Sequence, residues 1–237
     1  MIKALLLLLS GAKFGKVLLT GGSMLVSVFA YSFIFGWWYS VGFVVLIFVH
    51  EMGHYIAARQ RGLDVGAPTF IPFVGAWIAL KQLPHNAEVE AYVGLAGPLV
   101  GTLGALLCLY LAREFDSPLL LALSYAGFFL NLFNLIPLSP FDGGRITAVI
   151  SPKLWLIGAP ILVAIFLYHP SPLLLIMALL ALPQVMKAWR GPQSDEERAY
   201  YNVGFEARTN YGVFYVGLVI FLALMCHEVQ QELPRTR

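Results

Sequence analysis

Charged side chains leave five long stretches of this sequence free. Apart from histidine, no charged residue occurs within 17–50, 91–112, 117–141, 154–186 or 209–227. A helix needs about 20 apolar residues to cross the hydrocarbon core of a membrane. Each stretch is close in length to one or two crossings, so the sequence predicts an all-α polytopic membrane protein.

Turn-forming residues divide the two longest stretches. The first is too long for one helix, and Gly36–Ser40 combines small residues with aromatic residues that favour the membrane interface. We therefore expect helices at about 17–36 and 41–60. His169-Pro-Ser-Pro172 divides the fourth stretch, because proline cannot continue a helix. Together with the remaining stretches, this predicts six or seven transmembrane helices.

The composition agrees with this class. Apolar residues make up 59% of the 237 positions, and charged residues only 12%, against about 25% in an ordinary soluble domain. A net charge of +2 provides no basic surface for phosphates, so we expect no nucleic-acid partner. Two cysteines in apolar surroundings cannot form a disulfide framework.

The segment 65–83 does not fit a helix. Glycines and prolines at Gly66, Pro68, Pro72 and Gly75 interrupt β-forming residues, and the segment is too short and kinked to span a membrane. One interpretation is a re-entrant β-hairpin, which must be buried in protein or reached by water. The other is an ordinary loop at the interface.

The placement of lysine and arginine predicts the orientation, since cytoplasmic loops are enriched in both. With a cytoplasmic N-terminus and a re-entrant hairpin, almost all of them lie inside, and we expect a prokaryotic cell membrane. The leucine run in 1–9 is too short to cross and lacks a signal-peptide cleavage site, so we expect an interfacial segment. The residues expected inside are Lys3, Lys13, Lys16, Arg59, Arg61, Arg145, Lys153, Lys187, Arg190, Arg198 and Arg208.

An H-E-x-x-H pattern ends the second expected helix. His50-Glu51-Met52-Gly53-His54 follows an apolar run. Histidines at i and i+4 lie on one face of a helix, so both rings can reach one metal ion, and the glutamate can take a proton from a water molecule beside it. Ionisable groups at membrane depth are costly and usually functional. The alternative is a helix end with two interfacial histidines.

A catalytic zinc site needs a third protein ligand. Asp142 is the best candidate, because Pro137 and Pro140 break the fourth span just before it and two glycines follow it. A carboxylate on such a broken segment can enter the protein on the same side as His54. By itself, the aspartate could equally cap a helix at 143–150. The remaining histidines lie in a polar loop or on the expected far side: His85, His169 and His227.

Three motifs together resemble a known family. His50-Glu-Met-Gly-His54, Gly94-Leu-Ala-Gly-Pro98 and Asn134-Leu-Ile-Pro137 followed by Phe141-Asp-Gly-Gly-Arg145 are similar, in order and spacing, to motifs of the site-2 proteases, a family of intramembrane zinc metalloproteases. The resemblance covers about 41–150.

The resemblance implies one Zn²⁺ ion held by His50, His54 and Asp142, with Glu51 as the general base. It implies hydrolysis of a peptide bond in or near a transmembrane helix of a membrane-protein substrate. Members often carry a PDZ or CBS domain, and this sequence resembles a minimal member without either. We expect a single membrane domain, 1–237, with a catalytic core at about 41–150 and C-terminal helices at 151–237.

Several residues are candidates for contacts with the substrate or between helices. Asn134, and with less support Asn131, could hydrogen-bond the substrate backbone or an oxyanion, or satisfy backbone groups freed by Pro137. A strand edge within 65–83 could bind an unwound substrate by strand addition. Small residues allow close approach of helices, so glycines at spacings of three and four predict packing of the third span against the second; they are Gly94, Gly97, Gly101 and Gly104.

Two other functions are compatible with part of the pattern. A membrane metal-binding protein or transporter would explain the histidines and Asp142. It would not explain the glutamate between the histidines, and the sequence offers no second set of intramembrane ligands. An inactive scaffold of the same family is a further alternative, against which the intact Glu51 argues.

Overall fold

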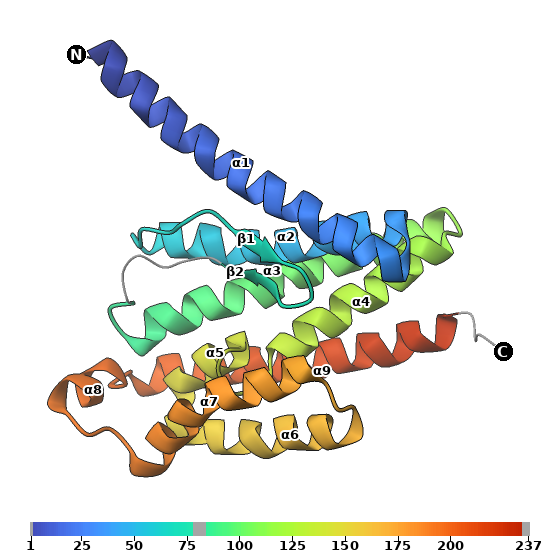
Figure 1. Cartoon of the computed structure of the whole chain (residues 1–237). Helices are drawn as coiled ribbons and strands as arrows, with labels where there is room; N and C mark the ends of the chain where they lie inside the picture. Colours follow the sequence, from blue (N-terminus) through green and yellow to red (C-terminus); the bar gives the residue numbers. More distant parts are fainter. Residues whose placement is uncertain (1, 78–83, 234–237) are drawn as a thin grey trace.

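The computed structural model describes residues 2–77 and 84–233, and only the backbone of 2–14, 16, 17 and 77. Almost all of the described chain is helical (Figure 1). In chain order the elements are α1 Ile2–Phe35, α2 Trp37–Gln60, β1 Thr69–Ile71, β2 Gly75–Trp77, α3 Ala87–Glu114, α4 Pro118–Asn134, α5 Asp142–Ile150, the 3-10 helix η1 Pro152–Leu154, α6 Trp155–Tyr168, α7 Pro172–Arg190, α8 Asp195–Tyr200 and α9 Phe205–Glu232.

The expected membrane spans all occur as helices, which confirms the all-α polytopic class. Among the described residues, α1, α2, α3, α7 and α9 are long and apolar enough to cross a membrane. The remaining two, α4 and α6, are shorter apolar helices of 17 and 14 residues. Proline ends or begins the helices where expected, since α6 ends at Tyr168 and α7 begins at Pro172.

Two helix boundaries differ from the prediction. The turn between α1 and α2 is a single residue, Gly36, so the aromatic residues expected in the turn already belong to α2. Gly36 has φ of 80°, which glycine adopts without steric cost, and this reverses the chain in one step. At its other end α1 begins at Ile2, so the leucine run forms one continuous helix with the first span instead of a separate segment.

Successive long helices run in alternating directions (Figure 1). The α1–α2, α3–α4 and α6–α7 connections lie at one end of the helices, and the connections that carry most of the lysines and arginines lie at the other. This up-and-down arrangement agrees with the expectation that most lysines and arginines lie on one side of the membrane.

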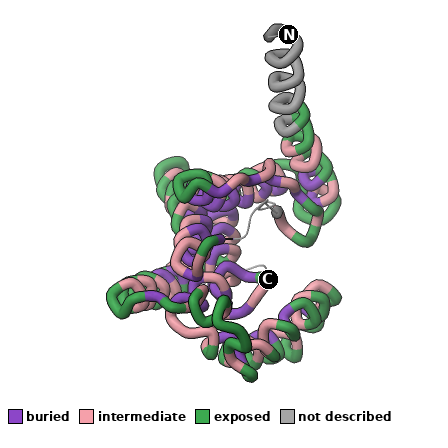
Figure 2. Tube along the Cα trace, turned by 90° about the vertical axis from the view of Figure 1, so that its left-hand side faces the viewer, coloured by how far each residue is buried: buried purple, intermediate pink, exposed green. Residues whose placement is uncertain are grey.

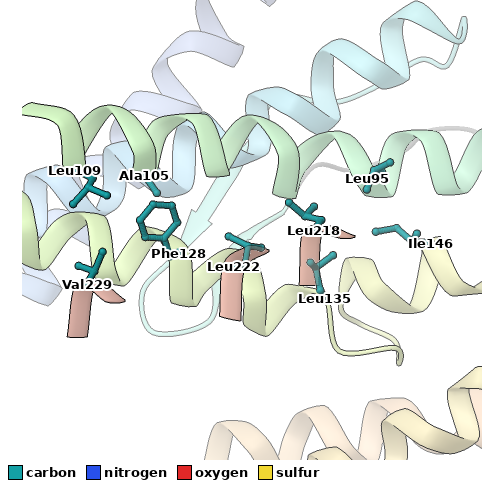
Figure 3. Close-up of a cluster of buried hydrophobic side chains, with 9 residues drawn as sticks. All are labelled: Leu95, Ala105, Leu109, Phe128, Leu135, Ile146, Leu218, Leu222 and Val229. Carbon is teal, nitrogen blue, oxygen red and sulfur yellow. The ribbon is translucent and has the colours of Figure 1, made fainter. Parts of the chain in front are cut away.

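The main apolar cluster joins the C-terminal helix to the middle of the chain. Figure 3 shows Phe128 of α4 between the side chains of α3 and α9. The same cluster includes Leu135, which follows α4, and Ile146 of α5. Helix α9 is therefore packed along α3, α4 and α5 through its buried residues Leu218, Leu222 and Val229.

Large apolar side chains also cover the outside of the helices. Buried residues gather toward the middle of the molecule, and exposed ones line its periphery (Figure 2). The exposed set includes Leu103, Leu107 and Tyr110 on α3 and Val213 and Phe214 on α9. Contiguous apolar surface of this kind is unusual on a soluble monomer and suits contact with lipid.

A small β-hairpin lies against α1. Strands β1 and β2 are antiparallel, with Phe70 opposite Ala76. Hydroxyl groups of α1 bind the backbone beside and within β1: Thr20 donates to the Pro68 carbonyl, and the Phe70 N–H donates to Ser23 Oγ at 3.1 Å. The hairpin confirms the β structure expected within 65–83, although 78–83 lie outside the described residues. Whether it is re-entrant stays a prediction.

Candidate metal centre

Helix α2 places the two histidines of the H-E-x-x-H pattern side by side. His50 and His54 are buried, with 3% and 6% of their surface exposed, and they lie one turn apart on the face that α2 turns to α3 and α4. The helix is regular through this region. The i, i+4 spacing alone therefore brings both imidazole rings to one point.

Asp142 reaches the same point from the start of α5. Helix α4 ends at Asn134, ahead of Pro137, and α5 begins at Asp142. The residue in the N-cap position is Phe141, and no side chain caps α5, so Asp142 does not have the capping role that was its alternative. Its carboxylate faces the histidines instead.

The distances between the three donor atoms suit one zinc ion. His50 Nε2 and His54 Nε2 are 3.1 Å apart, and each is 3.2 Å from Asp142 Oδ2. Ligands held tetrahedrally at about 2.0–2.1 Å from zinc lie about 3.3 Å from one another. The three atoms thus form one face of such a tetrahedron, and the fourth corner is left for a non-protein ligand. Among the described residues they form the one group of histidine, cysteine and acidic side chains with this geometry.

The hydrogen bonds of the histidines fix which nitrogen atoms are free. His54 Nδ1 lies 2.7 Å from the Val93 carbonyl oxygen, which can only accept, so Nδ1 carries the proton. His50 Nδ1 lies 2.8 Å from Asn131 Oδ1. Because Asn131 Nδ2 donates to the Gly127 carbonyl, Oδ1 is an acceptor and His50 Nδ1 also carries the proton.

In the neutral form, each histidine therefore directs an Nε2 lone pair toward the carboxylate oxygen of Asp142. Three acceptor atoms at such short separations repel one another unless a cation lies between them. This arrangement, with histidines oriented by a carbonyl and an amide behind them, is the usual one for zinc ligands.

Asn131 contacts His50 at the ring nitrogen that does not face Asp142. It is 1% exposed, and its Oδ1 and Nδ2 are both engaged as described. In the structure Asn131 binds His50. The sequence had led us to expect that Asn131 would contact the substrate. Nothing in the spacing of the sequence reveals this pairing, because the two residues are 81 positions apart.

Glu51 and Asn134 have fewer hydrogen-bond partners than Asn131. Glu51 is 8% exposed, and its carboxylate makes no hydrogen bond or ion pair within the described part of the chain. Asn134 is half-buried, and its Nδ2 donates to the Leu130 carbonyl one turn earlier. That bond is made to the backbone of its own helix, and it leaves Oδ1 as the atom for any further contact.

The glycines of α3 do more than pack two helices together. A Cβ atom at Gly97 would overlap the ring of His54, and one at Gly101 would overlap the amide of Asn131. Gly94 instead faces Arg145 and α5, so only part of the stripe packs against α2 as predicted. The expectation of simple packing holds for Gly104, which faces Val49 and Leu46.

The other histidines considered from the sequence take no part in the centre. His85, His169 and His227 are exposed. Glu90, in the first turn of α3, accepts a hydrogen bond from Tyr200 at 2.6 Å. Burial and the neighbouring Glu90 carboxylate raise the pKa of Tyr200 well above its usual range, so Tyr200 stays a neutral donor. Arg145 Nη1 lies 3.9 Å from Asp142 Oδ1. Arg145 is part of the sequence motif, but the sequence did not predict this contact.

Comparison with known proteins finds a similarity to one peptidase family. The model of peptidase family M50 matches residues 38–119, a range that includes the H-E-x-x-H pattern and the glycines of α3. A zinc metalloprotease of Methanocaldococcus jannaschii is 34% identical over 114 residues. Residues 38–119 are thus similar to peptidase family M50, and part of the chain is similar to a zinc metalloprotease.

Two more distant relatives also have names of zinc metalloproteases. A candidate zinc metalloprotease of Synechocystis is 30% identical over 106 residues, and Rip3, a candidate zinc metalloprotease of Mycobacterium tuberculosis, over 109 residues. The matches cover 46%, 42% and 42% of this chain but only 33%, 27% and 27% of the relatives. The chain thus spans between a quarter and a third of the length of these relatives.

Proposed function

We propose that this protein is a membrane-embedded zinc metalloendopeptidase of peptidase family M50 that hydrolyses a peptide bond in or near a transmembrane segment of another membrane protein. One observation carries the proposal: two buried histidines and a buried aspartate direct three lone pairs at a single point. The family match and the names of the relatives support the same activity.

Each residue of the centre has a distinct task in this proposal. His50, His54 and Asp142 hold the zinc ion. Bound zinc supplies Lewis acidity, which acidifies a water molecule and polarises a carbonyl oxygen. Glu51, adjacent to His50 and without a competing partner among the described residues, accepts the proton of the attacking water and passes it to the leaving amine. Asn131 keeps the His50 ring in its tautomer, which replaces the substrate role first considered for it.

The substrate must be presented as an extended strand, because a helix hides its carbonyl groups in internal hydrogen bonds. The hairpin offers an edge for this. The Phe70 N–H points to α1, so Phe70 and Ala76 form a pair that is not hydrogen-bonded to each other. The N–H and C=O of Ala76 therefore point away from β1, to the outer edge of β2. With α1 covering β1, we propose that a substrate strand pairs with β2.

The outer edge of β2 can be tested without breaking the hairpin. Ala76→Pro removes the outward N–H and leaves the bonds to β1 in place, since proline is tolerated at a strand edge whose N–H is not used by the sheet. We expect a roughly tenfold slower cleavage, the effect of one hydrogen bond, with unchanged zinc content. Ala76→Val, which keeps the N–H, is the matched control. Equal rates for the two variants would exclude pairing at this edge.

The orientation and the cellular setting also belong to the proposal. We place the N-terminus and the metal centre toward the cytoplasm of a prokaryotic cell, in accord with the arginines and lysines at one end of the helices and with archaeal and bacterial relatives. A metal transporter is not favoured, because the described residues contain no second group of ligands that would continue a path.

Glu51→Gln separates the protease from a metal-binding protein. The purified full-length chain would be placed in proteoliposomes with single-span test substrates, and both zinc content and cleavage would be measured. We expect zinc to be retained and cleavage to fall by at least about 100-fold, since the general base is lost and the ligands remain. Cleavage at the wild-type rate would refute the proposed mechanism.

A further inference from the structure

The segment between α4 and α5 sets the position of Asp142, and it satisfies only part of its backbone by itself, for example through the Phe141 N–H, which donates to the Leu138 carbonyl. Helix α4 ends at Asn134, so its last carbonyl groups have no intrahelical partner. Pro137 and Pro140 contribute no N–H to the loop that follows. Leu135 and Leu138 are 2% and 1% exposed. Backbone groups buried this deeply need partners from other parts of the protein.

Side chains from two C-terminal helices supply these partners. Tyr215 of α9 donates its hydroxyl to the Leu135 carbonyl at 2.6 Å. Gln184 of α7 accepts, through Oε1, the hydrogen bond of the Ser139 N–H. Both residues lie outside the expected catalytic core at 41–150 and outside the part matched by the family model.

The backbone groups that accept and donate these two hydrogen bonds lie directly against the first turn of α5, which carries Asp142. A Cβ atom at Gly143 would overlap the carbonyl groups of Leu135 and Ile136, so the residue after Asp142 rests on the carbonyl that Tyr215 binds. The rest of α9 is fixed by the apolar cluster of Figure 3, which contains Leu135 and Ile146 on either side of Asp142. A shift of the Leu135 carbonyl is therefore transmitted to the start of α5.

We propose that Tyr215 and Gln184 are positioning residues for the metal ligand Asp142, and that the functional unit extends beyond 41–150 to include α7 and α9. The proposal rests on the proposed zinc centre. Neither side chain touches the centre, so each acts through the loop at 135–141. Loss of either contact leaves a buried polar group without a partner and relaxes the position of the carboxylate.

The Tyr215 contact can be tested with a neighbour on the same helix. Tyr215→Phe removes one hydroxyl, and Tyr211→Phe removes a hydroxyl one turn earlier that lies 3.5 Å from the Glu88 carbonyl, away from the loop. Zinc affinity of the full chain would be measured by competition with a chromophoric chelator, and the visible spectrum of the cobalt-substituted protein would report the ligand geometry. We expect about tenfold weaker zinc binding and an altered cobalt spectrum for Tyr215→Phe only.

Gln184 provides an independent test with a rescue. Gln184→Met removes the oxygen that accepts from the Ser139 N–H while the side chain stays similar in size. Gln184→Glu keeps such an oxygen. We expect weaker zinc binding for the methionine variant and wild-type-like binding for the glutamate variant. If the role of Gln184 is purely structural, Gln184→Met should lower the thermal stability of the metal-free protein and leave the cobalt spectrum of the metal-loaded protein unchanged.

The outcomes separate this proposal from the proposed function. If the wild type binds zinc and Tyr215→Phe matches Tyr211→Phe in affinity and spectrum, the positioning role of Tyr215 is refuted while the metal centre stands. If Gln184→Met also matches the wild type, the C-terminal helices do not position Asp142. If the wild type binds no zinc, both proposals fail together.

Discussion

Two regions of very different construction meet at the metal centre. On α2, the two histidines occupy consecutive turns of a regular helix, and their separation follows from helical geometry. Asp142 instead follows a proline-broken segment whose backbone is held by α7 and α9. One part of the centre is therefore specified locally, and the other depends on side chains that are 45 and 80 positions from their partners. Substitutions at each region should disturb the centre in different ways.

The most severe effect is expected on the α2 side, from Gly97→Ala. The added Cβ would overlap the His54 ring, and the Ala96 backbone beside it already lies in tight contact with Gly53 of α2. Alanine is about 1 kcal/mol better than glycine within a helix, so any loss must come from displacement of the ligand. We expect zinc binding and cleavage to fall by at least about 100-fold, as for a lost ligand support. The control is Gly104→Ala, whose Cβ would lie 3.2 Å from Val49 Cγ1.

An intermediate effect is expected from the residue behind His50. Asn131→Leu removes the acceptor for His50 Nδ1 and leaves the ring free to change tautomer. Loss of such a partner weakens zinc binding by about 10- to 100-fold. Chelator competition would measure this change. Asn131→Asp keeps an acceptor for His50 Nδ1, so its zinc affinity should fall less than that of Asn131→Leu. An equal fall in affinity for the two variants would indicate that the packing of Asn131, and not its hydrogen bond, supports the centre.

The smallest effect is expected on the Asp142 side, from Gly158→Ala on α6. A Cβ there would overlap the Pro137 carbonyl and push on the loop at 135–141 from outside. Because the loop is also held by Tyr215 and Gln184, we expect only a several-fold loss of zinc affinity, below the roughly 10- to 100-fold loss typical of a lost partner of a metal ligand. Gly217→Ala on α9, with open space at its Cβ, is the control. A loss as large as that of Gly97→Ala would mean that the two regions are equally rigid.

The sequence predicts one region better than the other for physical reasons. Charge-free stretches and prolines identify the spans, and the i, i+4 spacing places His50 beside His54. The aspartate could be chosen only by elimination and by family resemblance, because the breaking prolines show where α4 ends but not where the following chain is directed.

Long-range contacts account for what the sequence did not predict. The pairing of Asn131 with His50 and that of Val93 with His54 each join different helices. The Val93 partner is a backbone carbonyl, which every residue type has, so the sequence cannot reveal it.

The one-residue turn at Gly36 was missed because the aromatic residues after it are compatible with both a turn and a helix. The division at 150 between core and C-terminal helices is not sharp in the structure, since α9 contacts both α4 and α5.

The central claim is that His50, His54 and Asp142 together bind one zinc ion, and X-ray absorption at the zinc edge tests it most directly. For the purified full-length wild type, we predict one zinc per chain with two imidazole nitrogens and oxygen ligands only. Asp142→Ala should keep the two imidazoles, lose an oxygen ligand and bind zinc more weakly. No bound zinc in the wild type, or an identical spectrum and affinity for Asp142→Ala, would contradict the account.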